Sequence, residues 1–304
     1  MAGHTPVGLV GLGLVGQALG RRLRAAGHEV WGWDLSEAAR QAFAAQGGQL
    51  ASSVRTLGQA CGTVLLAIYE TKDVQALAGE PEGLLGAGSR VHTLIDCSTG
   101  HPQQLETLAA ALAQRGITLL EAPLSGSSEQ IGAGQATMLL GGPAEAVAAQ
   151  DALLAAISAQ RMHVGPTGMG ARAKLATNLV LGLNRAALAE GLVFAESLGI
   201  APETFLALVL DSPARSVAAE LKGPLMVQAR FEPPQSRIRQ HLKDLGLMLE
   251  QAGSAGLAMP LTSAHAAVLE AAVHAGDGDL DNAAIVQQLR RGRTKPTDAT
   301  KERP

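Results

Sequence analysis

The sequence has very few aromatic residues and almost no cysteine. Phe, Trp and Tyr make up 2% of its 304 residues, whereas 47% of the residues are hydrophobic. The core must therefore consist mainly of aliphatic side chains, and abundant alanine and leucine are typical of closely packed helices. The two cysteines, Cys61 and Cys97, each lie within an apolar run. We expect buried free thiols in a reducing compartment, and no disulfide.

The sequence also lacks an excess of charge of either sign. It has 24 Lys and Arg against 27 Asp and Glu, for a net charge of -3. Nucleic-acid binders need clustered positive charge to displace counterions, so this balance argues against nucleic acid and favours small partners. The eight histidines show no metal-ligand spacing and join no cysteine cluster, so we expect no metal site. The absence of a G-x-S-x-G elbow disfavours hydrolysis.

No hydrophobic run is long and uninterrupted. The stretch from Val7 to Val15 is broken by glycines and follows no lysine or arginine, which argues against a secretory signal. The stretch from Leu175 to Ile200 is too polar for a membrane span. Its polar residues are Asn178, Asn184, Arg185, Glu190 and Glu196. We expect a cytoplasmic protein without membrane contact.

The first half of the chain alternates short β-rich runs with helical segments. This alternation predicts right-handed βαβ units and a mostly parallel sheet. Ser36 and Ser52 are candidate helix N-caps. The expected strands are Val7–Val10, Glu29–Trp33, Thr63–Ile68, Val91–Ile95, Ile117–Leu120, Thr137–Leu140 and Arg161–Val164.

After Gly165 the strand signals stop. Apolar residues then recur at helical spacing for about thirty residues, and further helical stretches follow. We predict an α/β domain over residues 1–165 and an all-α domain over 166–292, joined by a long interdomain helix. Residues 293–304 are polar and without periodicity, so we expect a disordered tail.

A glycine motif follows the first expected strand and opens a helix. It reads Gly11-Leu12-Gly13-Leu14-Val15-Gly16. The first glycine suits a tight turn, the second lets the backbone approach a pyrophosphate, and the third permits close packing of helix on strand. Asp34 ends the second strand, at the spacing of a carboxylate that binds ribose hydroxyls. The first domain therefore reads as a Rossmann-type, NAD-binding domain, and Asp34, beside Leu35 and Ser36, favours NAD over NADP.

Four further segments resemble the β-hydroxyacid dehydrogenase family, and the similarity runs from about Val7 to about Pro260. The segment from Asp96 to Pro102 resembles the family's D-x-S-T-x-x-P motif. The resemblance implies that Thr99 contacts the cofactor and that Ser98 lies near the substrate. Hydroxyls at the carboxyl end of a parallel strand agree with this, although an Asx or Ser/Thr turn alone would also place them there.

The segment Glu121-Ala122-Pro123-Leu124-Ser125-Gly126 is similar to the family's D-A-P-V-S-G-G motif. The resemblance implies that Ser125, Gly126 and the next residue hold the substrate carboxylate with hydroxyl and backbone donors. The family's second glycine is Ser127 here, which adds a side chain to the expected anion site.

The segment from Gly168 to Asn178 resembles the family's G-x-G-x-x-x-K-x-x-N-N motif. Lys174 and Asn178 are four residues apart, so they share one helical face. The resemblance implies that Lys174 is catalytic and that Asn178 helps bind the substrate, while Thr177 replaces the first asparagine. A partly desolvated lysine beside a positive nicotinamide has a lowered pKa, which suits proton exchange with a hydroxyl. The alternative is a solvated surface lysine.

A last segment contains the family's K-D-L motif, in which Lys243 reaches toward the cofactor. Ser236 replaces the family's aromatic residue, and Arg237 is either a pocket residue or a solvated charge. Ile68 and Tyr69 align with residues against the nicotinamide half. Tyr69, the only tyrosine, is an alternative proton donor.

These segments predict reversible hydride transfer between NAD and a small 3-hydroxy acid or the matching semialdehyde, with Lys174 as general acid and base. One alternative is an imine reductase-like enzyme, but such enzymes usually lack the lysine. Another is a catalytically silent NAD-binding regulator. The expected partner is a small carboxylate substrate, and the expected assembly is a homodimer or homotetramer.

Overall fold

The computed structural model describes residues 6–79 and 82–292. They form two compact units, divided between Asn178 and Leu179. The predicted boundary near Gly165 marks where the strands end, whereas the unit boundary falls inside the long helix, because the first turns of that helix pack on the first unit. The tail predicted for 293–304 lies outside the described residues.

The first unit is built on a twisted, mostly parallel sheet, as predicted. Its order is β3-β2-β1-β4-β5-β6-β8-β7, and β9 pairs with β8. The pairs from β3 to β6 are parallel, whereas β8 runs antiparallel to both β6 and β7. The strands are β1 (Val7–Val10), β2 (Val30–Trp33), β3 (Gln49–Leu50), β4 (Thr63–Leu66), β5 (Thr93–Asp96), β6 (Thr118–Glu121), β7 (Leu124–Ser125), β8 (Thr137–Gly141) and β9 (Arg161–Gly165).

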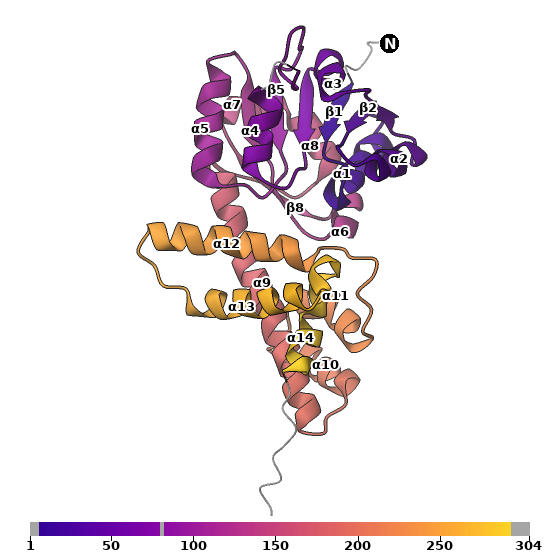
Figure 1. Cartoon of the computed structure of the whole chain (residues 1–304), viewed down its shortest axis with the longest axis vertical. Coiled ribbons are helices and arrows are strands. Elements are labelled where there is room, and N and C mark those ends of the chain that lie inside the picture. The colour runs from indigo at the N-terminus through magenta and orange to yellow at the C-terminus, as the bar shows by residue number, and fades with distance from the viewer. Residues whose placement is uncertain (1–5, 80–81, 293–304) are drawn as a thin grey trace, which may run out of the picture. The chain divides into compact units, whose positions relative to one another are not determined.

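Helices cover both faces of this sheet (Figure 1). They are α1 (Leu14–Ala25), α2 (Glu37–Ala45), α3 (Val54–Ala60), α4 (Thr71–Gly79), α5 (Pro102–Ala113), α6 (Ser128–Gly132), α7 (Ala144–Ala149) and α8 (Asp151–Ile157). Residues on alternate sides of one strand enter different cores: Leu9 packs with α1, α2 and α8, whereas Val10 packs with α3, α4 and α5. Two-sided burial explains why β1 is apolar throughout and why all four residues of β5 are buried.

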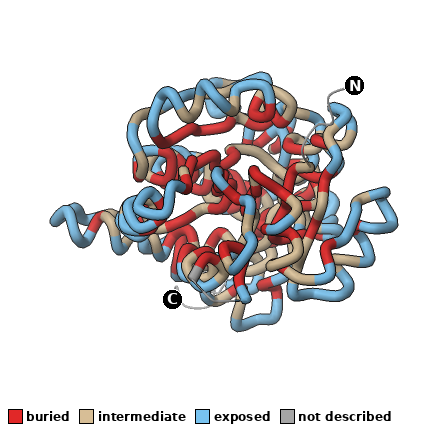
Figure 2. The backbone as a smooth tube through the Cα atoms, turned by 90° about the horizontal axis from the view of Figure 1, so that it is seen from above, coloured by how far each residue is buried: buried red, intermediate tan, exposed pale blue. Residues whose placement is uncertain are grey.

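Burial within each unit follows the same pattern. Figure 2 shows buried segments inside and exposed helix turns outside. Leu9, Leu65 and Ile95 on the central strands are fully buried. Each such side chain contributes about 1.5–3 kcal/mol relative to an exposed one, so the central strands form the rigid base on which the strand ends are held.

Two helix starts test the predicted caps. The Ser36 hydroxyl accepts a hydrogen bond from the Ala39 N–H at 3.3 Å, which confirms Ser36 as the N-cap of α2. Ser52 is wrong as the next cap, because the chain enters α3 one residue later. There the Ser53 hydroxyl accepts from the Thr56 N–H at 3.0 Å.

The second unit is helical, as predicted. The long helix α9 (Met169–Ser197) has 29 residues and is followed by α10 (Pro202–Leu210), α11 (Val217–Val227), α12 (Ile238–Ser254), α13 (Pro260–His274), η1 (Asp277–Asp279), η2 (Asn282–Ala284) and α14 (Ile285–Arg291). By length and composition alone α9 is apolar enough to cross a membrane, a test that the core helix of a soluble protein also passes. Three of its polar side chains, Lys174, Asn178 and Arg185, are buried within the protein.

Candidate functional site

The glycine motif forms the turn between β1 and α1. Gly11 has a φ of 89°, and a Cβ there would collide with the Ala67 carbonyl, so this position requires glycine. A Cβ at Gly16 would collide with the Gly11 carbonyl. Both glycines therefore allow the helix to start tightly against the strand end.

Gly13 differs from the other two glycines, because a Cβ there would meet nothing within 4 Å. It is exposed, and it is the N-cap of α1 without a side-chain capping bond. Open space in front of a helix N-terminus, where the first backbone N–H groups have no partner within the helix, fits a pyrophosphate. The residues present thus fit the phosphates of a dinucleotide, held by the loop from Gly11 to Gly16.

Asp34 follows β2 and faces this loop. One carboxylate oxygen accepts from the Leu12 N–H at 2.6 Å and the other from the Ser36 N–H at 2.7 Å. The carboxylate therefore fixes the loop and the end of β2 together, and each oxygen retains capacity for a ribose hydroxyl.

Arg40 lies beside Asp34. Only Leu35 and Ser36 were considered as neighbours of Asp34 in the sequence, so this arginine was not predicted. Its guanidinium donates to the Asp34 carbonyl at 2.6 Å and to the Leu35 carbonyl at 3.1 Å. Because α2 begins right after this turn, its first turn folds back on the strand end.

The ends of β4 and β5 are joined through Ser98. The Ser98 hydroxyl accepts from the Ile68 N–H at 3.1 Å, and the Ser98 N–H donates to the Asp96 carboxylate at 2.9 Å. Parallel strands end at the same edge of a sheet, so Ile68, Ser98 and Thr99 lie at the edge that also carries the glycine loop. Tyr69 follows Ile68 and is 42% exposed.

The predicted anion segment lies on β7 and the turn after it. Ser125 pairs with Thr137 of β8, and Gly126 has a φ of 155° with Ala136 packed against it. Ser127 caps α6: its N–H donates to the Gln130 side chain at 2.9 Å, and its hydroxyl accepts from the Gln130 N–H at 3.3 Å. The spacing Ser-x-x-Gln is a capping-box signal that the sequence reasoning missed.

Glu121, at the end of β6, holds the start of α9. Its carboxylate accepts from the N–H groups of Gly168 at 2.7 Å, Gly170 at 3.3 Å and Ala171 at 3.2 Å. Burial raises the pKa of this carboxyl, and the Asp96 carboxylate adds to the rise, whereas the three backbone hydrogen bonds oppose it. No local pattern in the sequence predicts this contact, because the partners lie 47 to 50 residues apart.

Lys174 and Asn178 lie on one face of α9, within the first unit. Both side chains are buried, at 6% and 8% exposed, and Lys174 Nζ donates to the Asn178 side-chain oxygen at 2.9 Å. Lys174 follows Ala171 by one helical turn, so it lies one turn from the Glu121 anchor. Thr177 bonds instead to the Ala173 and Lys174 carbonyls of its own helix.

The remaining predicted residues belong to the second unit. Lys243 on α12 forms an ion pair with Asp244 at 3.1 Å. The Ser236 hydroxyl accepts from the Asn282 side chain at 3.1 Å, and Arg237 lies 4.0 Å from the exposed Asp279 carboxylate. These contacts link Ser236 and Arg237 to the loop that precedes α14.

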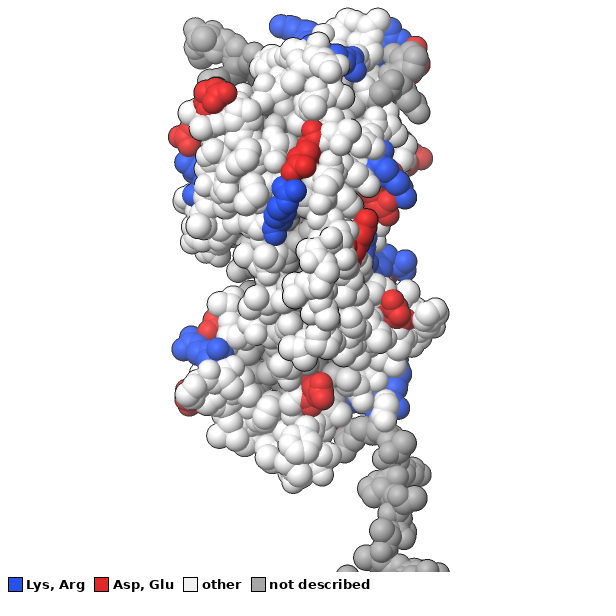
Figure 3. Space-filling view, turned by 90° about the vertical axis from the view of Figure 1, so that its left-hand side faces the viewer, with Lys and Arg blue, Asp and Glu red and all other residues white. Residues whose placement is uncertain are grey.

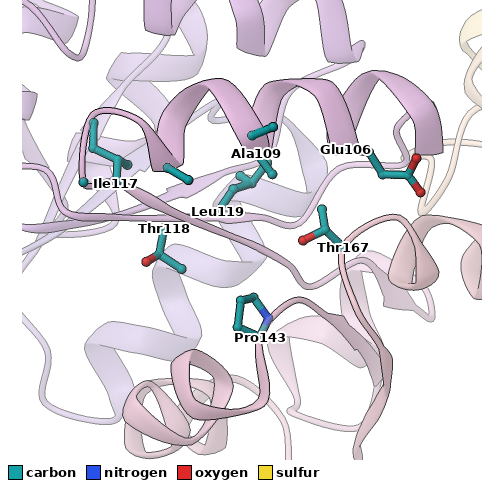
Figure 4. Close-up of a pocket in the computed structure, with 10 residues that line it drawn as sticks. Glu106, Ala109, Ile117, Thr118, Leu119, Pro143 and Thr167 are labelled. Carbon is teal, nitrogen blue, oxygen red and sulfur yellow. The ribbon is translucent and has the colours of Figure 1, made fainter.

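A separate surface pocket of about 470 Å³ lies along α5 and β6. Figure 4 shows Ala109, Ile117 and Leu119 on its wall, Pro143 below them, and Glu106 near Thr167 at one end. None of the site residues predicted from the sequence lines it.

Figure 3 shows acidic and basic side chains scattered over one face of the molecule. Within residues 6–79 and 82–292, no group of three or more His, Cys, Asp or Glu is placed to hold a metal.

Two family models match the chain. Residues 6–165 match the NAD binding domain of 6-phosphogluconate dehydrogenase. Residues 168–289 match the model described as NAD-binding of NADP-dependent 3-hydroxyisobutyrate dehydrogenase. Together they cover both structural units.

Individual proteins are similar over most of their length. The chain is 30% identical to 2-(hydroxymethyl)glutarate dehydrogenase of Eubacterium barkeri over 282 residues, 92% of this chain and 93% of that protein. It is 32% identical to 3-hydroxyisobutyrate dehydrogenase of Pseudomonas aeruginosa over 263 residues, 84% of this chain and 88% of that protein. The crystal structure of 3-hydroxyisobutyrate dehydrogenase from Salmonella typhimurium superposes with a TM-score of 0.83 at 26% identity, covering 93% of this chain and 99% of that one.

Proposed function

Since the chain belongs to the β-hydroxyacid dehydrogenase family, we propose that it oxidises a small 3-hydroxy acid to the matching semialdehyde with NAD, and catalyses the reverse reduction. The observation that carries the proposal is the buried Lys174–Asn178 pair on the helix anchored at the carboxyl end of the sheet. Lysine is rarely buried, because burial of its charge costs free energy. A buried lysine held by an amide oxygen is therefore a candidate for proton transfer at a functional site.

The dinucleotide would be held by the loop from Gly11 to Gly16, by Asp34, and by Ile68, Tyr69 and Thr99 at the neighbouring strand ends. We also propose the contribution of Lys243 that the family resemblance implies. When bound, the nicotinamide supplies the acceptor for a hydride from the substrate carbon.

The residues of the chain would handle the proton and the carboxylate. In the oxidation, Lys174 Nζ would take the proton of the substrate hydroxyl as the hydride leaves the carbon that bears this hydroxyl, and in the reduction it would return that proton. Asn178 holds the lysine side chain in place. Ser98, Ser125, Gly126 and Ser127 would bind the substrate carboxylate through hydroxyl and backbone donors.

For the cofactor, we propose a preference for NAD over NADP. The support is the Asp34 carboxylate at the end of β2, because a negative group there repels a 2′-phosphate. Arg40 works in the opposite direction, since its guanidinium lies against the same turn. Comparing kcat/KM for the two cofactors in wild type, Asp34→Ser and Arg40→Ala weighs these charges. We expect Asp34→Ser to move the preference toward NADP; an unchanged ratio would contradict the role of Asp34.

A panel of hydroxy acids and the matching semialdehydes, followed by NADH absorbance, tests the activity. We expect turnover with at least one 3-hydroxy acid in one direction and with its semialdehyde in the other. Absence of turnover with every member of the panel, in an enzyme that binds NADH, would contradict the dehydrogenase proposal and favour a silent NAD-binding protein.

We also propose a homodimer or homotetramer in the cytoplasm. The support for assembly is apolar surface on the helical unit, where Phe194, Leu198 and Leu261 are 63%, 61% and 69% exposed. Light scattering during gel filtration measures the mass directly, and a monomer at micromolar concentration would contradict this assembly.

A further inference from the structure

We propose that Glu121 is a positioning residue for Lys174, which rests on the proposed function of that lysine. The role follows from three backbone hydrogen bonds that join the end of β6 to the first turn of α9. Glu121 acts through the helix, one turn before Lys174.

The geometry around Glu121 is close-packed and specific. A Cβ at Gly141 would collide with its carboxylate, and a Cβ at Gly170 would lie 2.9 Å from its own Cβ. Two glycines, one on β8 and one on α9, thus allow the carboxylate to reach the N–H groups. Because Glu121 is 1% exposed, water cannot readily replace these contacts.

The same edge positions Ser98 in a parallel way. Asp96 and Glu121 are register partners on β5 and β6. The Asp96 carboxylate accepts from the Ser98 N–H, and the Glu121 carboxylate accepts from N–H groups at the start of the helix that carries Lys174. Asp96 fixes the Ser98 turn, whereas Glu121 fixes the start of α9. The distance between Ser98 and the helix of Lys174 is thereby set by two neighbouring strands of the rigid sheet.

The contacts require an acceptor on both carboxylate oxygens. Gly168 and Gly170 donate to one oxygen and Ala171 donates to the other. An amide at this position offers only one oxygen and presents an N–H₂ group to a donor. Glu121→Gln therefore keeps the shape of the side chain but breaks part of the anchor.

Steady-state kinetics of Glu121→Gln test the inference. We expect kcat to fall on the order of 100-fold, because a small misplacement of a reacting group has effects of that size. The Kd for NADH, measured by the fluorescence of the two tryptophans on β2, should change by less than about threefold, because Glu121 lies outside the proposed cofactor site. A tenfold change in Kd would correspond to about 1.4 kcal/mol of binding free energy. Glu121→Asp keeps the charge and should recover part of kcat.

The control is Glu106→Gln. It removes a carboxylate on α5 that accepts a hydrogen bond from the side chain of Arg172 on α9, and it should leave kcat unchanged.

A double-mutant cycle separates positioning from a general structural effect. On a Lys174→Ala background, Glu121→Gln should lower the residual rate by less than about twofold, because linked residues are not additive. A full further loss of the residual rate, or an unchanged kcat in folded Glu121→Gln, would overturn the inference.

Amide hydrogen exchange on the wild-type enzyme keeps the inference testable if Glu121→Gln fails to fold or no hydroxy acid is turned over. The N–H groups of Gly168, Gly170 and Ala171 should exchange as slowly as those of the central sheet. Fast exchange would overturn the anchor itself, whereas slow exchange without turnover would overturn the proposed function and leave the anchor standing.

Discussion

The two units use buried charge differently. In the first unit, the Glu121 carboxylate accepts hydrogen bonds from three backbone N–H groups of α9. In the helical unit, the Asp281 carboxylate accepts two hydrogen bonds from the buried Lys222 ammonium, at 2.9 and 2.8 Å. It also accepts from the backbone N–H groups of Gln235, Ser236 and Ala283. Both carboxylates fix backbone segments, and the difference is that Asp281 also holds a buried cation, which joins α11 to the segment before α14 through an ion pair.

The helical unit also buries basic groups with fewer contacts. Within the part of the chain that the structure describes, Arg185 Nε and one terminal nitrogen have no hydrogen-bond partner, and burial lowers its pKa to about 10. Burial and Arg185 also lower the pKa of His265 to about 4. The ring of His241 lies 5.2 Å from that of His265. Stability in this unit should therefore depend more on charge and pH than in the first.

The largest effect is expected for Asp281→Asn. It leaves the Lys222 ammonium buried without its counter-charge, and breaking a buried ion pair costs about 3–5 kcal/mol. Urea denaturation measures the free energy of unfolding. A loss below about 1 kcal/mol would show that this pair contributes no more than a surface pair and would remove the contrast between the units.

The pH dependence of stability is the next effect. The pKa of His265 is lowered in the folded protein to about 4 from 6.5, so between these values the unfolded chain binds a proton that the folded chain does not. Stability should therefore fall as the pH drops from 6.5 to 4, by up to about 3 kcal/mol from this group. Arg185 on α9 opposes its protonation, and the ring of His241 on α12 lies 5.2 Å from its own ring.

His265→Leu should flatten this part of the stability curve, measured by urea denaturation at successive pH values. His274→Asn, at the exposed end of the same helix, is the control and should follow the wild-type curve. Equal slopes for wild type and His265→Leu would contradict the assignment.

A smaller effect is expected at the cap of α2. Ser36→Ala removes the hydrogen bond to the Ala39 N–H and should cost about 1 kcal/mol, whereas Ser36→Gly should cost only a few tenths. Thermal unfolding of the two variants checks the order. An equal loss of stability in both variants would show that the hydrogen bond between the Ser36 hydroxyl and the Ala39 N–H contributes little to the first unit.

The smallest effect is expected at the surface of the helical unit. Arg239 pairs with Asp279 through two contacts of 2.7 and 2.8 Å, but both side chains are about half exposed or more. Arg239→Ala should therefore cost about 0–1 kcal/mol. A loss as large as that of Asp281→Asn in the same denaturation experiment would show that burial is not what separates the two pairs.

Local patterns in the sequence predicted much of the fold. The strand Val7–Val10, the glycine turn after it and the shared face of Lys174 and Asn178 follow from spacings of a few residues. The mostly parallel sheet follows from the alternation of strand and helix signals. The two-residue strands β3 and β7 were missed, because two residues are too few to show alternation.

Contacts between distant parts of the chain were not predictable in the same way. Glu121 reaches N–H groups 47 to 50 residues away, and only the paired strand ends bring them together. Arg40 contacts Asp34 across six residues, and Ser127 forms a capping box. The Ser-x-x-Gln spacing is a local signal for the capping box, whereas no local pattern predicts the Arg40 contact.

The most direct test of the account is the ratio of kcat for wild type and Lys174→Ala, measured at saturating cofactor with the best acid from the panel. Loss of the general acid and base should lower kcat by about 100- to 10,000-fold, with NADH affinity retained. The matched control is Thr177→Ala on the same helix. In the described contacts the Thr177 hydroxyl donates to the backbone carbonyls of Ala173 and Lys174, so its removal should keep kcat within about twofold. Undiminished kcat in Lys174→Ala would contradict the central claim.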